Sequence, residues 1–560
     1  MSADEPISQL MAQSRALLKQ HQYQEALALC EQALALDSTV PAGWSQKGAA
    51  LERLKHYPEA ISACYQAIKL DPAHARAYAI AAEALVSLHR AREGLTLAER
   101  AVALDPNDPD THSGKGTALL HLRRYQESLA AYEGALALDP NHLEGITGRG
   151  AALDNLKRHE EALAEADRAI ALDPFYPDAH NNRAVALGHL KRHEEALAVL
   201  EQVIALDSQL AGPYSNKALV LGDLKRYEEA LAACEQAIAL DPQLAPAYNN
   251  KGFVLWCLKR HEEALAEADR AIALDPQLAT AYNNKALALA NLKRHKEALA
   301  ACEQAIQLDP GLGPAYNNKG VALWNLKRHE EALTAFDQAI VLEPDHGLFY
   351  TNKGVVLTEM RQPYRALAAH QRAVELDPNY ALAHYLTGVT LGSMMRAAGA
   401  GRRLAGRYAQ EGLEAYGRAI QLAPDEPLSY NGRGVALLSL DRLQEALADF
   451  DRAIQLDPTL ALAYFNKGFA LSKLKRHEEA LTAYDQALAL NPVYAPAYAQ
   501  KAEALNALQR YEEALDACAL VLQRIPRFSA VYRCKARALW NLGHRWGAAR
   551  AYLRYRFLPL

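Results

Sequence analysis

The chain has 560 residues, of which 50% are hydrophobic, and it contains only 30 Gly and 25 Pro, a composition that favours helix along most of its length. Its 61 Lys and Arg nearly balance its 66 Asp and Glu, so the net charge of −5 excludes a globally basic protein and makes nucleic acid an unlikely partner. No stretch approaches 18 apolar residues, the N-terminus lacks the pattern of a secretory signal, and the seven scattered Cys fit a reducing compartment. We therefore expect a cytoplasmic protein without a membrane span.

A 34-residue repeat organises the chain. The tripeptide Leu-Asp-Pro, or a close variant, recurs every 34 residues from Leu36 to Leu376, and the series resumes at Leu422 after an interval of 46. In chain order, the sequence predicts an N-terminal tail (1–6), eleven uninterrupted copies (7–380), a copy with a 12-residue insertion (381–426), three further copies (427–528) and a shortened, basic and aromatic last copy (529–560).

Each copy has the pattern of two amphipathic helices. In the copy at 245–278, numbered from 1 to 34, Tyr248, Gly252 and Leu255 occupy positions 4, 8 and 11 and share one face of the first helix. Ala264 and Ala271, at positions 20 and 27, share one face of the second helix. The Asp-Pro pair ends that helix, because Pro cannot continue it. One such pair cannot bury its apolar face alone, so we expect the copies to stack into a solenoid.

This pattern of an aromatic, a small residue, two alanines and a proline resembles the tetratricopeptide repeat. The resemblance covers residues 7–560. It implies an all-α fold, a right-handed superhelical solenoid of about sixteen tandem helix–turn–helix units.

The insertion in the twelfth copy has no apolar periodicity and is rich in Gly. We therefore predict an exposed loop or extended hairpin between about Met394 and Tyr408.

No sequence motif indicates catalysis, since a nucleophile elbow, an HExxH motif and a P-loop are all missing. We expect no enzymatic activity and no cofactor. His recurs at position 17 of several copies, as at His159 and His261, but Tyr227 stands at the same position. Because neighbouring copies are about 10 Å apart, these His are too distant from each other to share an ion, and we predict that they pack rather than bind metal.

The first helix of each copy presents positions 2, 6, 9 and 13 opposite its packed face, and in tetratricopeptide superhelices these positions line the inner, concave surface. We call this surface the groove face. Position 6 is Asn in six consecutive copies: Asn182, Asn216, Asn250, Asn284, Asn318 and Asn352. An amide both donates and accepts hydrogen bonds, so such a ladder can pair with any peptide backbone. The apolar row at position 9, which includes Phe253, Leu287 and Val321, can hold side chains.

The asparagine ladder resembles that in the tetratricopeptide arm of O-linked N-acetylglucosamine transferase, where such residues hold substrate polypeptide. It favours a non-catalytic scaffold or adaptor that binds extended polypeptide. One alternative is that the asparagines only brace neighbouring copies. Another is that the chain is a targeting or regulatory arm of a separately encoded enzyme such as a glycosyltransferase.

The last copy breaks the charge balance. Residues 517–560 contain nine Lys or Arg and no Asp or Glu, together with a group of aromatic residues. A terminal copy normally has a polar outer face. We therefore predict a C-terminal surface for self-association, an acidic protein or a membrane surface, formed by Trp540, Trp546, Arg550, Tyr552 and Arg554. The alternative is an imperfect cap that packs its aromatic side chains inward.

Overall fold

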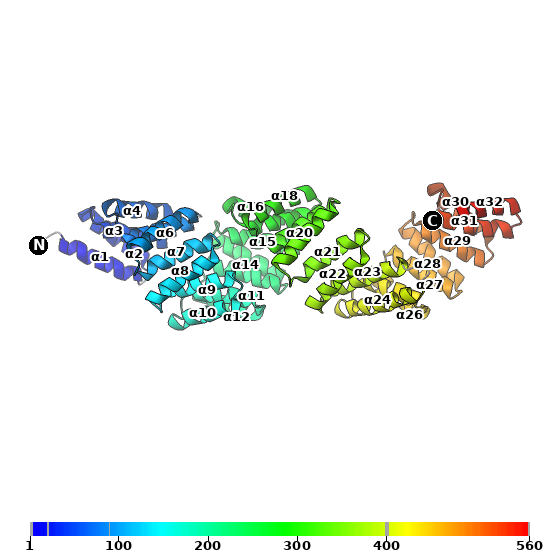
Figure 1. Ribbon diagram of the computed structural model, residues 1–560, viewed down its shortest axis with the longest axis horizontal. Coiled ribbons are helices and arrows are strands. Elements are labelled where there is room, and N and C mark those ends of the chain that lie inside the picture. Colours follow the sequence, from blue (N-terminus) through cyan, green and yellow to red (C-terminus); the bar gives the residue numbers. More distant parts are fainter. Residues whose placement is uncertain (1–3, 20–21, 89, 398–401, 558–560) are drawn as a thin grey trace. The chain divides into compact units, whose positions relative to one another are not determined.

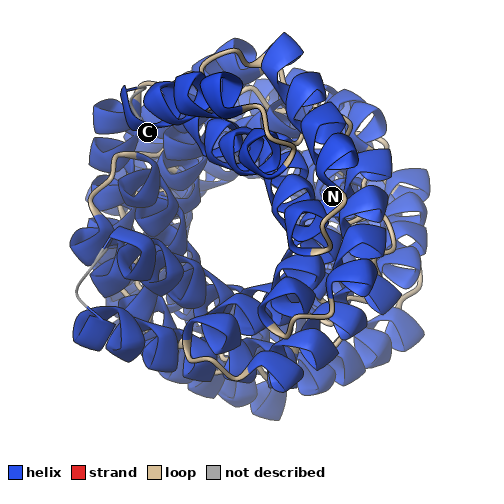
Figure 2. Ribbon diagram, turned by 90° about the vertical axis from the view of Figure 1, so that its right-hand side faces the viewer, coloured by secondary structure: helices blue, strands red, loops and turns tan. Residues whose placement is uncertain are grey.

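The computed structural model describes residues 4–19, 22–88, 90–397 and 402–557. These described residues form 32 helices and no strand, so the prediction of an all-α repeat fold is confirmed (Figure 1; Figure 2). The chain divides into two compact units, Met1–Asn284 and Lys285–Leu560. The boundary between them lies within α17 (Ala279–Asn291).

The first unit consists of helix pairs in which each odd-numbered helix packs against the helix that follows it and against the first helix of the next copy, as α3 does with α4 and α5. Helix α1 begins at Asp4, so residues 4–6 of the predicted tail are helical. The helices wholly inside this unit are α1 (Asp4–Lys19), α2 (Tyr23–Leu36), α3 (Pro41–Arg53), α4 (Tyr57–Leu70), α5 (Ala75–Ser87), α6 (Ala91–Leu104), α7 (Pro109–His121), α8 (Tyr125–Leu138), α9 (Leu143–Asn155), α10 (His159–Leu172), α11 (Pro177–His189), α12 (His193–Leu206), α13 (Ala211–Asp223), α14 (Tyr227–Leu240), α15 (Ala245–Cys257) and α16 (His261–Leu274).

The second unit repeats the same arrangement of helix pairs. Its helices are α18 (His295–Leu308), α19 (Gly313–Asn325), α20 (His329–Leu342), α21 (Gly347–Glu359), α22 (Pro363–Leu376), α23 (Ala381–Ala397), α24 (Arg402–Leu422), α25 (Pro427–Ser439), α26 (Leu443–Leu456), α27 (Ala461–Lys473), α28 (His477–Leu490), α29 (Ala495–Ala507), α30 (Tyr511–Arg524), α31 (Ser529–Asn541) and α32 (Arg545–Phe557).

Most of the described turns inside a helix pair contain one residue in the left-handed region. Lys259, between α15 and α16, has a φ of 61°. The N–H of the next residue, Arg260, donates to the carbonyl of Leu255 at 2.9 Å, which ends the first helix in the manner of a Schellman motif. Twelve non-glycine residues in the described part of the chain adopt this conformation, all at the same place in their copies. The turn is therefore a fixed element of the repeat.

The core of each copy forms where a small residue on the first helix meets a larger one on the second. A Cβ atom added to Gly320 of α19 would lie 2.6 Å from a ring carbon of Phe336 in α20, so the close approach of these helices requires glycine there. Phe336 is fully buried. In the copy at 245–278, Ala264 and Ala271 are likewise buried, which confirms the face predicted for the second helix.

The predicted loop between Met394 and Tyr408 is wrong. The insertion instead lengthens both helices of the twelfth copy, because α23 has 17 residues and α24 has 21, whereas the pair in the preceding copy has 13 and 14. Met394 and Tyr408 are both buried and share an apolar cluster with Leu391. Each added turn covers the other, so both ends of the predicted loop belong to the core, and residues 398–401 lie outside the described residues.

Candidate groove and contact surfaces

The asparagine ladder of the first unit is hydrogen-bonded from copy to copy. In each case the side-chain Nδ2 of a position-6 Asn donates to a residue at position 5 of the preceding copy. Asn182 donates to the carbonyl of Thr147 at 3.0 Å, and Asn216 to Oδ1 of Asn181 at 2.6 Å. Asn250 donates to both the carbonyl and Oγ of Ser215 at 3.1 Å.

Asn284 continues this pattern within the first unit, because its Nδ2 lies 2.9 Å from Oδ1 of Asn249. In the second unit, Nδ2 of Asn352 donates to Oδ1 of Asn317 at 2.8 Å. Within a copy, Oδ1 of Asn250 accepts from Nδ2 of the adjacent Asn249, and Oδ1 of Asn318 from Nδ2 of the adjacent Asn317, both at 3.3 Å. The bonds between copies are what the bracing alternative requires.

The ladder nevertheless stays open to solvent. Asn182, Asn216, Asn250, Asn284, Asn318 and Asn352 are all half-buried. An Asn amide can donate two hydrogen bonds and accept two, so at Asn250 the bonds to Ser215 and Asn249 still leave one lone pair of Oδ1 for a further partner. Bracing and ligand binding are therefore chemically compatible at the same side chain.

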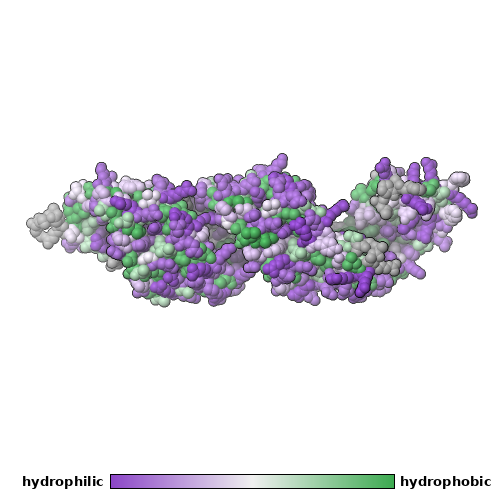
Figure 3. All heavy atoms as spheres, in the orientation of Figure 1, coloured by the Kyte–Doolittle hydropathy of each residue, from purple (hydrophilic) through white to green (hydrophobic). Residues whose placement is uncertain are grey.

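An apolar row lies beside the ladder at position 9. Phe253, Leu287 and Val321 are half-buried, and Leu219 is exposed. The ring of Phe253 stacks on Trp256 of the same helix, with centroids 6.1 Å apart, so the aromatic side chain has a supported position. On the face drawn in Figure 3, apolar residues lie in small groups between polar ones in both units.

The predicted C-terminal surface is largely uncovered. Trp546 is 92% exposed, and Trp540 and Tyr552 are also exposed. Trp540 and Tyr552 line one groove of about 420 Å³ together with Arg533, Ala536, Arg537, Ala548 and Ala549. Trp546 and Arg550 are exposed without lining it. The inward-packing alternative does not describe these aromatic residues, although Tyr532 of α31 is buried.

Sequence profiles of the tetratricopeptide repeat match more than two thirds of the chain. The matched residues are 11–75, 81–142, 148–211, 212–244, 245–278, 279–312, 313–346, 427–460 and 461–494. The chain belongs to the tetratricopeptide repeat family. Membership supports a role in protein–protein interaction.

Solved structures resemble this tetratricopeptide chain as well. A crystal structure of the APC/C hetero-tetramer Cut9–Hcn1 covers 89% of the chain and 96% of its own, at 16% identity and a TM-score of 0.57, which supports the fold. The structure of YrrB, a TPR protein with an unusual peptide-binding site, is 26% identical over 35% of the chain and 95% of its own, with a TM-score of 0.28. A comparison with curated proteins gave no match.

The row of Lys at position 7 of the tetratricopeptide copies is engaged within the chain. Lys217 lies 2.9 Å from Glu201 and Lys353 lies 2.6 Å from Asp337, in each case on the second helix of the preceding copy. These pairs neutralise the row locally, which disfavours its use for attracting acidic partners.

No described helix is both long and apolar enough to cross a membrane.

Proposed function

We propose that this chain is a non-catalytic scaffold that binds extended polypeptide segments along the groove face. The observation that carries the proposal is the pairing, copy after copy, of a half-buried Asn amide with a partly exposed apolar side chain. Adjacent first helices are about 10 Å apart and an extended peptide rises about 3.3 Å per residue. One amide therefore meets about every third residue of a bound strand.

The ladder has two roles in this proposal. One donor of each amide stabilises the stack, as the bonds from Asn250 to Ser215 and from Asn284 to Asn249 illustrate. The remaining donor and acceptor capacity faces the ligand backbone. Because backbone contacts do not depend on side chains, selectivity among peptides falls to the apolar row, including Phe253.

The test uses the full chain and linear peptides selected from a random display library. Replacing both Asn250 and Asn284 with Ala should weaken binding by about 1–3 kcal/mol, or about 5- to 150-fold, and similarly for peptides of different sequence. Asn141→Ala is the matched control, since Asn141 is exposed in the connection between α8 and α9, at position 33 of its copy and off the groove face. Phe253→Ala should change which peptides are preferred.

Thermal melting of the same preparations separates the two roles of the asparagines. If the double variant melts several degrees earlier while its peptide affinity stays unchanged, the amides only brace the copies. If no peptide binds the unaltered chain, the groove proposal fails as a whole.

We also propose that the C-terminal surface is a contact surface. The exposed Trp540, Trp546 and Tyr552 support this, as does the basic character of residues 517–560. The double change Trp540→Gln and Trp546→Gln should lower the sedimentation coefficient if copies of the chain self-associate, or abolish retention on an acidic peptide column if the partner is acidic. A monomer that the column does not retain, with or without the change, would contradict the proposal.

A further inference from the structure

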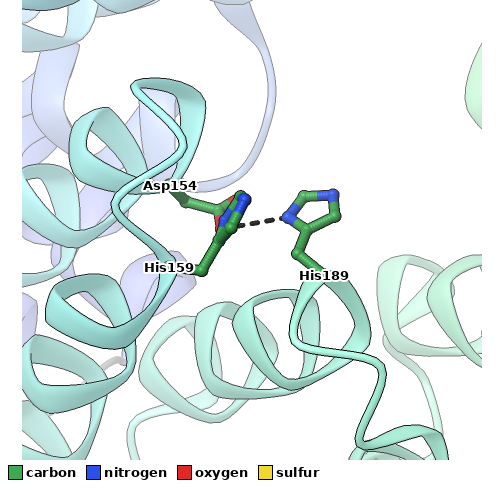
Figure 4. A group of neighbouring side chains, drawn as sticks. All are labelled: Asp154, His159 and His189. Atoms are coloured by element: carbon green, nitrogen blue, oxygen red, sulfur yellow. Dashed lines mark hydrogen bonds and ion pairs between the residues drawn. The ribbon is translucent and has the colours of Figure 1, made fainter. Parts of the chain in front are cut away.

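Three side chains of types that bind metal meet at one edge of the first unit (Figure 4). Asp154 lies near the end of α9, His159 is the first residue of α10, and His189 is the last residue of α11. Oδ1 of Asp154 lies 2.7 Å from Nδ1 of His159 and 3.0 Å from Nδ1 of His189. All three potential ligand atoms lie within 4.8 Å of one another.

Stacking of the copies explains this meeting. Position 17 of one copy lies beside position 13 of the next. His193 and Asp223 stand at these two positions, with Nδ1 and Oδ2 3.8 Å apart. One copy further along, Tyr227 and Cys257 stand there and are hydrogen-bonded. The junction between the fifth and sixth copies is where the sequence places His at both positions. Asp154 then adds a carboxylate from position 12 of the fifth copy.

We propose that Asp154, His159 and His189 form a site for a zinc ion. Two imidazole nitrogens and one carboxylate oxygen are the ligand set of many zinc sites that keep a fourth position for water. The side chain of His189 is 52% exposed, so solvent and an ion can reach the cluster. The ion links the end of α9 and the start of α10 to the end of α11, and so joins two neighbouring copies.

The observed distances are close to those that zinc needs. Ligand bonds of about 2.0–2.1 Å in a tetrahedral arrangement place the ligand atoms about 3.3 Å apart. The two measured separations from Asp154 Oδ1 are 2.7 and 3.0 Å, a few tenths of an ångström below this value, and all three ligand atoms lie within 4.8 Å of one another. On binding, each Nδ1 gives up to solvent the proton that it shares with Asp154, and the neutral imidazole, with its remaining proton on Nε2, turns the Nδ1 lone pair toward the ion.

The surrounding charges favour a cation. The Asp154 carboxylate supplies a negative charge at the centre of the cluster, in contact with both imidazoles. Asp223, on α13 of the next copy, adds a second negative charge that acts on His189. The competing interpretation is a cluster held only by hydrogen bonds from two imidazoles to one carboxylate, with no affinity for metal beyond that of isolated surface His.

The test titrates the full chain, freed of affinity tags and treated with a chelator, with Co²⁺ and then displaces the Co²⁺ with Zn²⁺. Visible absorption of bound Co²⁺ reports the coordination. The variants use residues that the repeat already carries at each position: His159→Tyr, as at Tyr227, and His189→Asn, as at Asn291. His261→Tyr is the matched control, because His261 occupies position 17 of the eighth copy, away from the cluster.

We expect one equivalent of Co²⁺ to bind with visible bands that Zn²⁺ abolishes. Both His159→Tyr and His189→Asn should weaken binding at least tenfold, and His261→Tyr should leave it unchanged. Equal affinity in all four proteins, or the absence of visible bands in the unaltered chain, would overturn the proposal. Circular dichroism in chelator checks that each variant is folded, and if His159→Tyr is not, His189→Asn decides.

Discussion

The residue at position 24 is buried in the middle of the chain and uncovered in the last copy. Phe336, at this position in α20, is fully buried, whereas Tyr552, its counterpart in α32, is 49% exposed. Phe336 shares its cluster with Val356, Leu357 and Ala366 of the following copy. No described helix follows α32 to do the same for Tyr552. The comparison teaches that the side chain at position 24 packs on the first helix of its own copy, as Phe336 does on Gly320, while the following copy completes its burial.

The most direct way to break this comparison is to truncate both side chains. Phe336→Ala should destabilise the second unit by about 3–5 kcal/mol, because it leaves a cavity between two copies. Tyr552→Ala should cost less than about 1 kcal/mol. Hydrogen exchange of the native protein measures both effects locally, which matters because a long repeat array need not unfold in one step. If both variants lose protection against hydrogen exchange equally, the following copy does not account for the burial of the side chain at position 24.

The insertion extends the comparison to residues that the 34-residue repeat does not contain. Met394→Ala should destabilise the twelfth copy by about 2–5 kcal/mol, because Met394 is buried beside Leu391 and Tyr408. Arg403→Ala, an exposed position on α24, is the control and should stay within about 0.5 kcal/mol. Native-state hydrogen exchange of the amides in α23 and α24 gives both values. If Met394→Ala leaves the free energy of unfolding unchanged, the added turns pack loosely.

His370 places a buried titratable group at position 24. Burial lowers its pKa to about 4, below the 6.5 of an exposed His. The unfolded chain therefore binds more protons, so this residue lowers stability as pH falls from about 6.5 toward 4, by about 1.4 kcal/mol per pH unit. His370→Phe, the residue found at Phe336, should remove this dependence without unfolding the copy. Melting temperatures of both proteins at pH 7.5 and pH 5.5 give the measurement, and parallel slopes would count against a buried neutral imidazole.

The smallest effect is expected where the last copy lacks an ion pair that others have. Arg260 donates to the Glu263 carboxylate from Nε at 2.7 Å and from Nη2 at 2.6 Å, whereas His544 and Gly547 occupy these positions in the last copy. Both partners are fully exposed, so Glu263→Gln should not change the melting temperature measurably at physiological salt. A clear decrease in melting temperature would show that the ion pair stabilises the fold.

The sequence predicted the fold through its periodicity, because the apolar spacing and the Asp-Pro stop, or a close variant of it, recur along the chain. The prediction for the insertion was wrong because Gly399 and Gly406 suggested a turn, while the burial of Met394 and Tyr408 depends on two lengthened helices covering each other. The ladder was visible as a row of Asn, but the donation from five of its amides to the preceding copy was not. The meeting of Asp154, His159 and His189 was missed because only position-17 His were compared with one another. Position 17 of one copy lies much closer to position 13 of the next copy than to position 17 of that copy.

Helices α10 and α16 have the same fourteen-residue sequence, HEEALAEADRAIAL, and begin 102 residues apart. Their side chains alone therefore do not specify which first helix each of them packs against during folding. Chain connectivity resolves the ambiguity. Closing a loop of about a hundred residues, instead of a turn of about four, costs about 3 kcal/mol more in entropy, so each helix docks on the partner it is tethered to. A repeat this regular owes its correct assembly to its short turns, and cutting the chain at one of them would let identical helices exchange places.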